Sequence, residues 1–134
     1  GTQRVSQAVA FAAAVRYLQH LGMENVEAWE HELGARLVEG VQKIEGVRLL
    51  GPTDPTKRAG LVALAIEGVH PHDVGQLLDT QGIAVRVGHH CAQPLHRCAG
   101  VTASTRASTY IYNTTEDVDA FLKALAEVRP YFGF

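Results

Sequence analysis

The sequence predicts an α+β domain in which helices cover one face of a small, mainly antiparallel sheet. Apolar residues recur every three or four positions near both ends of the chain, which indicates amphipathic helices. Between them, short apolar runs are bounded by glycine and proline, as is typical of strands. A chain of 134 residues, 46% of them hydrophobic, is sized for one domain with its own core, so residues 1–134 are taken as a single domain.

Four helices are predicted, and each has a recognisable start or stop signal. Glycine closes the first three, because it adopts the left-handed conformation at a helix end, and Pro71 suits a first helical turn. Thr114 and Asp117 form a capping-box pattern at the start of the last helix, which Pro130 is expected to end. We expect the first two helices each to bury an apolar face. The predicted helices span residues 8–22, 26–46, 71–82 and 114–130.

Four strands are predicted from the apolar runs. Two are bounded by a cluster of proline, aspartate and glycine, and the last is rich in β-branched and aromatic residues and is expected to contain a bend. The third strand is followed by a loop that contains Cys91, and catalytic residues commonly lie in such loops. The predicted strands span residues 47–50, 61–66, 83–87 and 105–112.

Composition excludes several classes of function. Twelve basic and 14 acidic side chains give a net charge of −2, without the basic stripe that nucleic-acid binding requires. Polar residues interrupt every apolar stretch before the roughly 20 residues needed to span a bilayer, so we expect no membrane segment. Two cysteines in a chain of this size favour a reducing, cytoplasmic compartment. The opening Gly1-Thr2 lacks a methionine or leader, and we expect the chain to be a fragment.

Cys91 follows the third predicted strand, with Arg86, His89 and His90 nearby in sequence. Positive charge and hydrogen-bond donors favour the thiolate, which is the reactive form of cysteine. The residues alone support equally well a small buried cysteine that takes no part in chemistry. Arg106, among small polar residues, has the geometry to hold a carboxylate through two hydrogen bonds, although a solvated surface arginine is the commoner case.

A metal site is a second interpretation of the same region, because histidine and cysteine are the ligands that zinc prefers. The spacing argues against it, since structural zinc sites pair two ligands in a tight turn with a second pair farther along. Here five donors fall within ten residues, and we expect no metal. The donors are His89, His90, Cys91, His96 and Cys98.

The run Arg-Val-Gly-His-His-Cys-Ala-Gln-Pro at 86–94, with Arg-Ala-Ser at 106–108 and Tyr-Asn-Thr-Thr-Glu-Asp-Val-Asp at 112–119, resembles the Suf-type, group II cysteine desulfurases. These belong to the class V aminotransferase family and are fold-type I enzymes that use pyridoxal 5'-phosphate. The resemblance covers essentially the whole chain, and it implies that the chain corresponds to the small C-terminal domain of such an enzyme. It implies an enzyme that converts L-cysteine to L-alanine and leaves a persulfide on Cys91.

The resemblance also implies roles for the other residues of the region. Arg106 matches the arginine that pairs with the substrate carboxylate, and Arg86 and His90 match positions that line the same pocket. His89 is expected to assist through hydrogen bonds. Thr2 matches a threonine that, in a homodimer, contacts the cofactor phosphate held by the other subunit.

The family's Schiff-base lysine lies in a Ser-His-Lys context that does not occur in this chain, so the larger domain is absent and the isolated chain is expected to be inactive. The implied sulfur acceptor is a small protein of the SufE or SufU kind that serves iron-sulfur cluster assembly. Two alternatives remain open: a selenocysteine lyase or cysteine sulfinate desulfinase of the same family, and a small metal-binding or interaction module.

Overall fold

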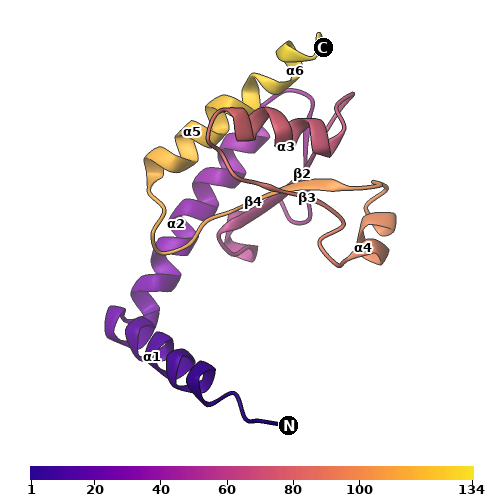
Figure 1. Cartoon of the computed structure of the whole chain (residues 1–134). Coiled ribbons are helices and arrows are strands. Elements are labelled where there is room, and N and C mark those ends of the chain that lie inside the picture. The colour runs from indigo at the N-terminus through magenta and orange to yellow at the C-terminus, as the bar shows by residue number, and fades with distance from the viewer.

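The computed structural model describes residues 1–134, and its elements alternate between helices and short strands (Figure 1). In chain order they are α1 (Val5–Leu21), α2 (Met23–Gln42), β1 (Val47–Leu50), the 3-10 turn η1 (Pro55–Lys57), β2 (Leu61–Ile66), α3 (Pro71–Thr80), β3 (Arg86–Gly88), α4 (Gln93–Cys98), β4 (Ser104–Ser108), α5 (Thr115–Ala126) and α6 (Val128–Tyr131). None of these helices is both long enough and apolar enough to cross a membrane.

The four strands form one sheet in the order β1-β2-β4-β3, and every neighbouring pair is antiparallel. This confirms the predicted α+β class and the antiparallel sheet. Because successive side chains of a strand point to opposite faces, the register divides the sheet into two chemically different surfaces. Leu64 lies opposite Thr105 on one face, whereas the next pair, Ala63 and Arg106, lies on the other.

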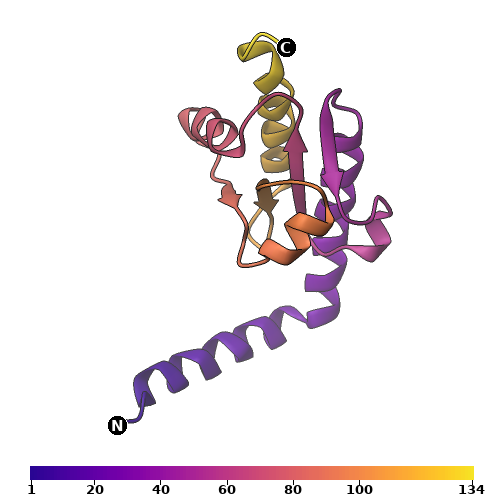
Figure 2. The ribbon, with the colours of Figure 1, turned by 90° about the vertical axis from the view of Figure 1, so that its right-hand side faces the viewer.

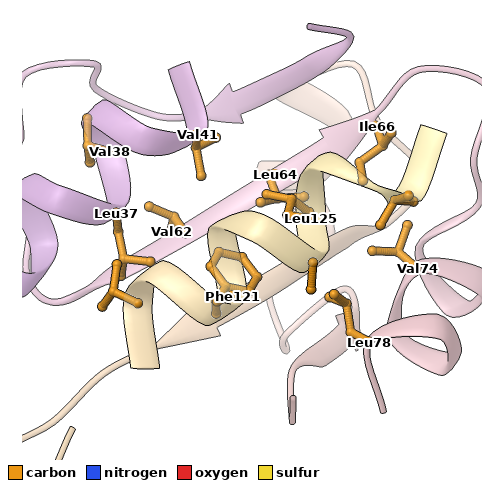
Figure 3. Packing of buried hydrophobic residues seen from close by; sticks show 14 of the residues in the cluster. Leu37, Val38, Val41, Val62, Leu64, Ile66, Val74, Leu78, Phe121 and Leu125 are labelled. Carbon is orange, nitrogen blue, oxygen red and sulfur yellow. The ribbon is translucent and has the colours of Figure 1, made fainter. Parts of the chain in front are cut away.

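The core lies between the first of these faces and helices α2, α3 and α5, as Figure 3 shows. Leu64 in the central strand β2 is fully buried, and Leu37 from α2, Leu78 from α3 and Leu125 from α5 pack in the same cluster. Burying a side chain of this size stabilises the fold by about 1.5–3 kcal/mol. The core therefore requires these three helices on one side and leaves the opposite face of the sheet to helix α4 and to solvent.

Helix α1 forms where it was expected, but its apolar face is not buried within this chain. No residue of α1 is buried, and Phe11 is 73% exposed. Gly22, with φ of 86°, turns the chain between α1 and α2, so α1 projects away from the rest of the domain (Figure 2). The periodicity of α1 is that of a helix with a buried face, yet no other part of this chain covers it.

Several element boundaries differ from the sequence predictions. Strand β3 begins only at Arg86, and β4 ends at Ser108 because the following residues form a turn, in which the backbone N–H of Asn113 donates to the carbonyl of Tyr110 over 3.0 Å. Pro130 does not end the last helix: α5 stops at Ala126, and Pro130 lies inside the short helix α6. Proline is tolerated there because a helix this short leaves its first N–H groups without intrahelical partners.

The capping box at α5 is confirmed. The Thr114 side chain accepts a hydrogen bond from the backbone N–H of Asp117, and the Asp117 carboxylate accepts one from the backbone N–H of Thr114. We expect Thr114→Ala to lower the free energy of unfolding by about 1 kcal/mol, since a helix cap is lost. Urea unfolding would measure this, with Thr102→Ala in an exposed loop as the control. Equal stability of the two variants would contradict the capping role.

Candidate functional site

The face of the sheet opposite the core carries two arginines side by side. Arg86 of β3 and Arg106 of β4 are direct cross-strand partners. Like charges opposite each other destabilise a sheet, and here the strand residue beyond them on the same face is Ala63, which supplies no counter-charge. The Nε of Arg106 is buried and has no hydrogen-bond partner within the chain. The paired positive charges and the unpartnered donor make this surface a candidate site for an anion.

Cys91 lies in a tight turn directly after β3. The backbone N–H of Ala92 donates to the carbonyl of His89 over 2.8 Å, and the two central residues, His90 and Cys91, have φ of 52° and 59°. Two positive φ angles in succession match a type I′ turn, which non-glycine residues adopt only when the surroundings stabilise it. Cys91 is exposed, which rules out the alternative of a buried structural cysteine.

The turn is anchored to the sheet by two histidines that share one hydroxyl group. The Nε2 of His90 lies 3.1 Å from the Oγ of Ser104, and the Nε2 of His96 lies 2.9 Å from the same oxygen. Ser104 is the cross-strand partner of Gly88 and is completely buried. The hydroxyl group thus connects β4, the Cys91 turn and helix α4.

Helix α4 covers this end of the sheet and was not predicted. His96, its one buried residue, also places Nδ1 3.0 Å from the carbonyl of Ala92. At the other end of α4, Arg48 of strand β1 donates from Nη1 to the carbonyl of Ala99 over 3.1 Å. Helix α4 is therefore tied to the sheet through its C-terminal half, by His96 to Ser104 and by the Ala99 carbonyl to Arg48, and the His96–Ala92 bond joins that half to the turn that precedes the helix.

The pKa of His90 is lowered below its ordinary value by burial first, then by the positive charge of Arg106. His96 and Arg86 act in the same direction, and hydrogen bonding to the backbone of Ser104 opposes them. His90 is consequently neutral at neutral pH, so that one ring nitrogen carries a proton and the other is an acceptor. A neutral imidazole can accept a proton from a thiol, and His90 precedes the exposed Cys91 in the chain.

We expect a histidine-selective NMR titration to show His90 losing its proton below pH 6.5, the pKa of a free histidine. Arg106→Gln should raise the pKa of His90, although burial still holds it below the free value. Arg97→Gln, an exposed arginine of α4, is the control and should leave the pKa unchanged. An unchanged midpoint in Arg106→Gln would contradict the electrostatic contribution.

The lowered pKa of His90 also predicts how the free energy of unfolding changes with pH. As the pH falls below about 6.5, the unfolded chain binds a proton at His90 before the folded chain does, so the free energy of unfolding decreases. This contribution is fully present above pH 6.5 and is lost progressively as the pH falls toward the lowered folded pKa. In His90→Gln, the free energy of unfolding should depend less on pH below about 6.5, as measured by urea unfolding at several pH values. An identical pH dependence in the variant and the unmodified protein would contradict this contribution of His90.

Most of the predicted site residues converge in the structure. Strands β3 and β4 and the turn between β3 and α4 supply them: Arg86, His90, Cys91 and Arg106. His89 belongs to the same turn, and its ring stacks edge-to-face on that of His96 with centroids 5.7 Å apart. Thr2 is not part of the cluster, because it precedes α1 at the N-terminus, which lies far from α4 in both views (Figures 1 and 2).

The alternative metal site does not form. Nowhere in residues 1–134 do three histidine, cysteine or acidic side chains come close enough to hold one ion. The Nε2 atoms of His90 and His96 are directed to Ser104, and Nδ1 of His96 is directed to the carbonyl of Ala92. Cys98 lies at the far end of α4 from Cys91, so the five donors are not gathered around one point.

Two features of the site were missed in the sequence. Helix α4 had a signal, because Pro94 stands in its first turn, where proline is favoured, but its six residues are too few for an apolar period. Ser104 had none, since a serine before a strand is usually solvated. Only the antiparallel pairing of β3 with β4 shows that Ser104 lies next to the Cys91 turn.

The fold and the site define a small α+β domain that presents an exposed cysteine in the turn after β3, the strand whose Arg86 pairs across the sheet with Arg106. The profile of the aminotransferase class-V family matches residues 1–121, and the chain belongs to this family. The "Probable cysteine desulfurase 2" of Mycobacterium leprae is 49% identical over 133 residues, which cover 99% of this chain and 32% of the relative. A "Probable cysteine desulfurase" of Halalkalibacterium halodurans is 48% identical with the same coverage.

Solved structures agree with the sequence relatives. A cysteine desulfurase from Thermococcus onnurineus, in its apo form, is 40% identical and superposes with a TM-score of 0.91 over 96% of this chain and 32% of its own. The cysteine desulfurase CsdA from Escherichia coli, with an S-sulfonic acid, is 34% identical with a TM-score of 0.89, over 98% of this chain and 32% of its own. The chain therefore spans about a third of the length of the relatives it matches.

Proposed function

We propose that this chain is the C-terminal domain of a pyridoxal phosphate-dependent cysteine desulfurase that collects sulfur from L-cysteine on Cys91. The observation that carries the proposal is the exposed Cys91 thiol in the turn that follows β3. The same strand carries Arg86, which is the cross-strand partner of Arg106. An amino-acid substrate brings a carboxylate, which suits the paired guanidinium groups. A thiol placed next to it suits sulfur transfer.

The residues of this face fit the substrate half of such a site. The unpartnered Nε of Arg106 is the kind of donor a carboxylate satisfies, and no acidic residue stands next to it in the sheet. The chain's lysines lie elsewhere, at the end of α2, in η1 and on α5: Lys43, Lys57 and Lys123. The lysine that bonds the cofactor must therefore belong to the remaining two thirds of the enzyme, and Thr2 is proposed to contact the cofactor phosphate across a homodimer.

The bound cofactor supplies an electron sink for the amino acid, and this chain supplies the acceptor for sulfur. Arg106 holds the substrate carboxylate through parallel hydrogen bonds, with Arg86, His89 and His90 lining the pocket. The Cys91 thiolate attacks the sulfur of the bound cysteine, an S–S bond forms, and the carbon–sulfur bond breaks with its electron pair left on carbon. That carbon takes up a proton, L-alanine leaves, and Cys91 keeps the persulfide.

The rest of the assignment follows from the same proposal. The exposed position of Cys91 allows a protein acceptor of the SufE or SufU kind to take the sulfur for iron-sulfur cluster assembly in the cytoplasm. The apolar surface of α1, including Phe11, then has the remainder of the enzyme to pack against. The isolated chain, without the lysine-bearing part, is proposed to be inactive.

The proposal is tested by intact mass spectrometry of the whole protein after incubation with L-cysteine and pyridoxal phosphate. A single added sulfur is expected in the unmodified protein and in Cys98→Ala, but not in Cys91→Ala. Cys98 is a matched control because it is the other exposed cysteine and lies at the opposite end of α4. Absence of persulfide from every sample, or its presence in Cys91→Ala, would overturn the assignment. Relative rates on cysteine, selenocysteine and cysteine sulfinate would identify the preferred substrate.

A further inference from the structure

We propose that His96, acting through the Ser104 hydroxyl group, is a positioning residue that keeps the proton of neutral His90 on Nε2. The Nδ1 of His90 is thereby left as the proton-accepting nitrogen of the Cys91 turn. The inference concerns which nitrogen of His90 is basic, and its use in catalysis rests on the proposed desulfurase function. The geometry points to it through three hydrogen bonds that, with both histidine rings neutral, share donors and acceptors in only one way.

The first bond determines the tautomer of His96. Its Nδ1 lies 3.0 Å from the carbonyl of Ala92, and a carbonyl oxygen only accepts, so Nδ1 must carry a proton. The same carbonyl also accepts the backbone N–H of His96 over 3.1 Å, which holds the ring against the first turn of α4. Whenever the His96 ring carries one proton, that proton is on Nδ1, and Nε2 is a lone-pair acceptor.

The second bond determines the direction of the Ser104 hydroxyl group. The Oγ lies 2.9 Å from Nε2 of His96, so the single hydroxyl proton is donated to that nitrogen. Ser104 is completely buried and His96 is 6% exposed, so water does not compete for this bond. The serine oxygen is left with lone pairs alone.

The third bond transmits the constraint to His90. Because Ser104 has already donated its proton, the Nε2 of His90, 3.1 Å from Oγ, must be the donor. The lowered pKa of His90 keeps the ring neutral, so Nδ1 has no proton. His90 precedes Cys91 in the strained turn, which places this basic nitrogen on the residue adjacent to the thiol.

The charged groups around His90 favour the same state. Arg106 from β4 and Arg86 from β3 disfavour a proton on His90 through their positive charge, as does His96 whenever it is itself protonated, and no carboxylate is among the groups that influence His90. Within the proposed enzyme, the Nδ1 of His90 accepts the thiol proton as the thiolate forms. The resulting imidazolium retains its Nε2–H bond to Ser104, so the network need not rearrange during proton transfer.

The tautomer can be measured directly in the whole protein labelled with ¹⁵N at histidine, where protonated and unprotonated ring nitrogens have well-separated shifts. His90 is assigned by comparison with His90→Gln. We expect an unprotonated Nδ1 and a protonated Nε2 at neutral pH. In His96→Leu, the serine proton becomes free to point at His90, and the Nε2–H form should no longer dominate. Ser104→Ala removes only the hydroxyl oxygen and should have the same effect with less disturbance of packing.

The pH profile of kcat/KM provides a second measurement that a purely structural role would not change. We expect kcat/KM of His96→Leu to fall about tenfold and the acid limb of its pH profile to be displaced. The general base His90 is still present in this variant, but its basic nitrogen is no longer held in one position. His96→Gln retains an acceptor for Ser104 and should recover much of the loss.

Each unfavourable result has a distinct meaning. A protonated Nδ1 on His90 in the unmodified protein overturns the inference, as does an unchanged tautomer in both folded His96→Leu and Ser104→Ala. If the tautomers are as expected but no persulfide forms on Cys91, the proposed function fails and the assignment of the His90 tautomer stands. The NMR measurement does not depend on turnover and so separates the two.

Discussion

Arg106→Ala is expected to lower kcat/KM for L-cysteine by about a hundredfold or more in the whole enzyme. Hydrogen bonds to a charged group contribute roughly 1.5–3 kcal/mol each, and 1.4 kcal/mol corresponds to a factor of ten. The guanidinium group of Arg106 is well placed for two such bonds, because its Nε is buried and unpartnered on the face it shares with Arg86. Steady-state measurement of alanine formation gives the ratio.

Two further variants separate charge from geometry at this position. Arg106→Lys keeps the positive charge but loses the two parallel donors, so we expect it to recover only part of the activity. Arg97→Ala, an exposed arginine on α4, should have activity close to that of the unmodified enzyme. Wild-type kcat/KM in Arg106→Ala would exclude this residue as the carboxylate anchor.

Leu64→Ala is expected to lower the free energy of unfolding by about 2–5 kcal/mol. Leu64 is fully buried in the central strand β2, where it packs between the helices and the sheet (Figure 3). The cost combines the lost burial with the cavity left behind, because close-packed neighbours relax only in part. A change of this size is a large fraction of the 5–15 kcal/mol that typically stabilises a domain.

Leu61→Ala in the same strand provides the matched control. Leu61 is 38% exposed, so truncating it should cost much less than truncating Leu64. Urea unfolding of both variants with equal slopes would make the midpoints directly comparable. Equal losses in the two variants would mean that β2 does not alternate between a buried and an exposed face as the structure has it.

The site was only partly accessible from the sequence. The position of Cys91 after a strand, with Arg86 and two histidines before it, pointed to chemistry because these residues are neighbours in the chain. Arg106 is twenty positions beyond Arg86, and only antiparallel pairing of β3 with β4 makes them partners. The exposure of Cys91 likewise could not be derived, since cysteine is as common in cores as at reactive positions.

The sequence by itself determined the class of fold and most elements, because hydrophobic periodicity and capping signals such as Thr114 and Asp117 act over a few residues. Only the tertiary structure decided that the rest of this chain leaves α1 uncovered, that α4 covers one end of the second face of the sheet, and that Ser104 joins His90 to His96. These features depend on contacts between segments distant along the chain, whose register and packing partners local patterns do not encode.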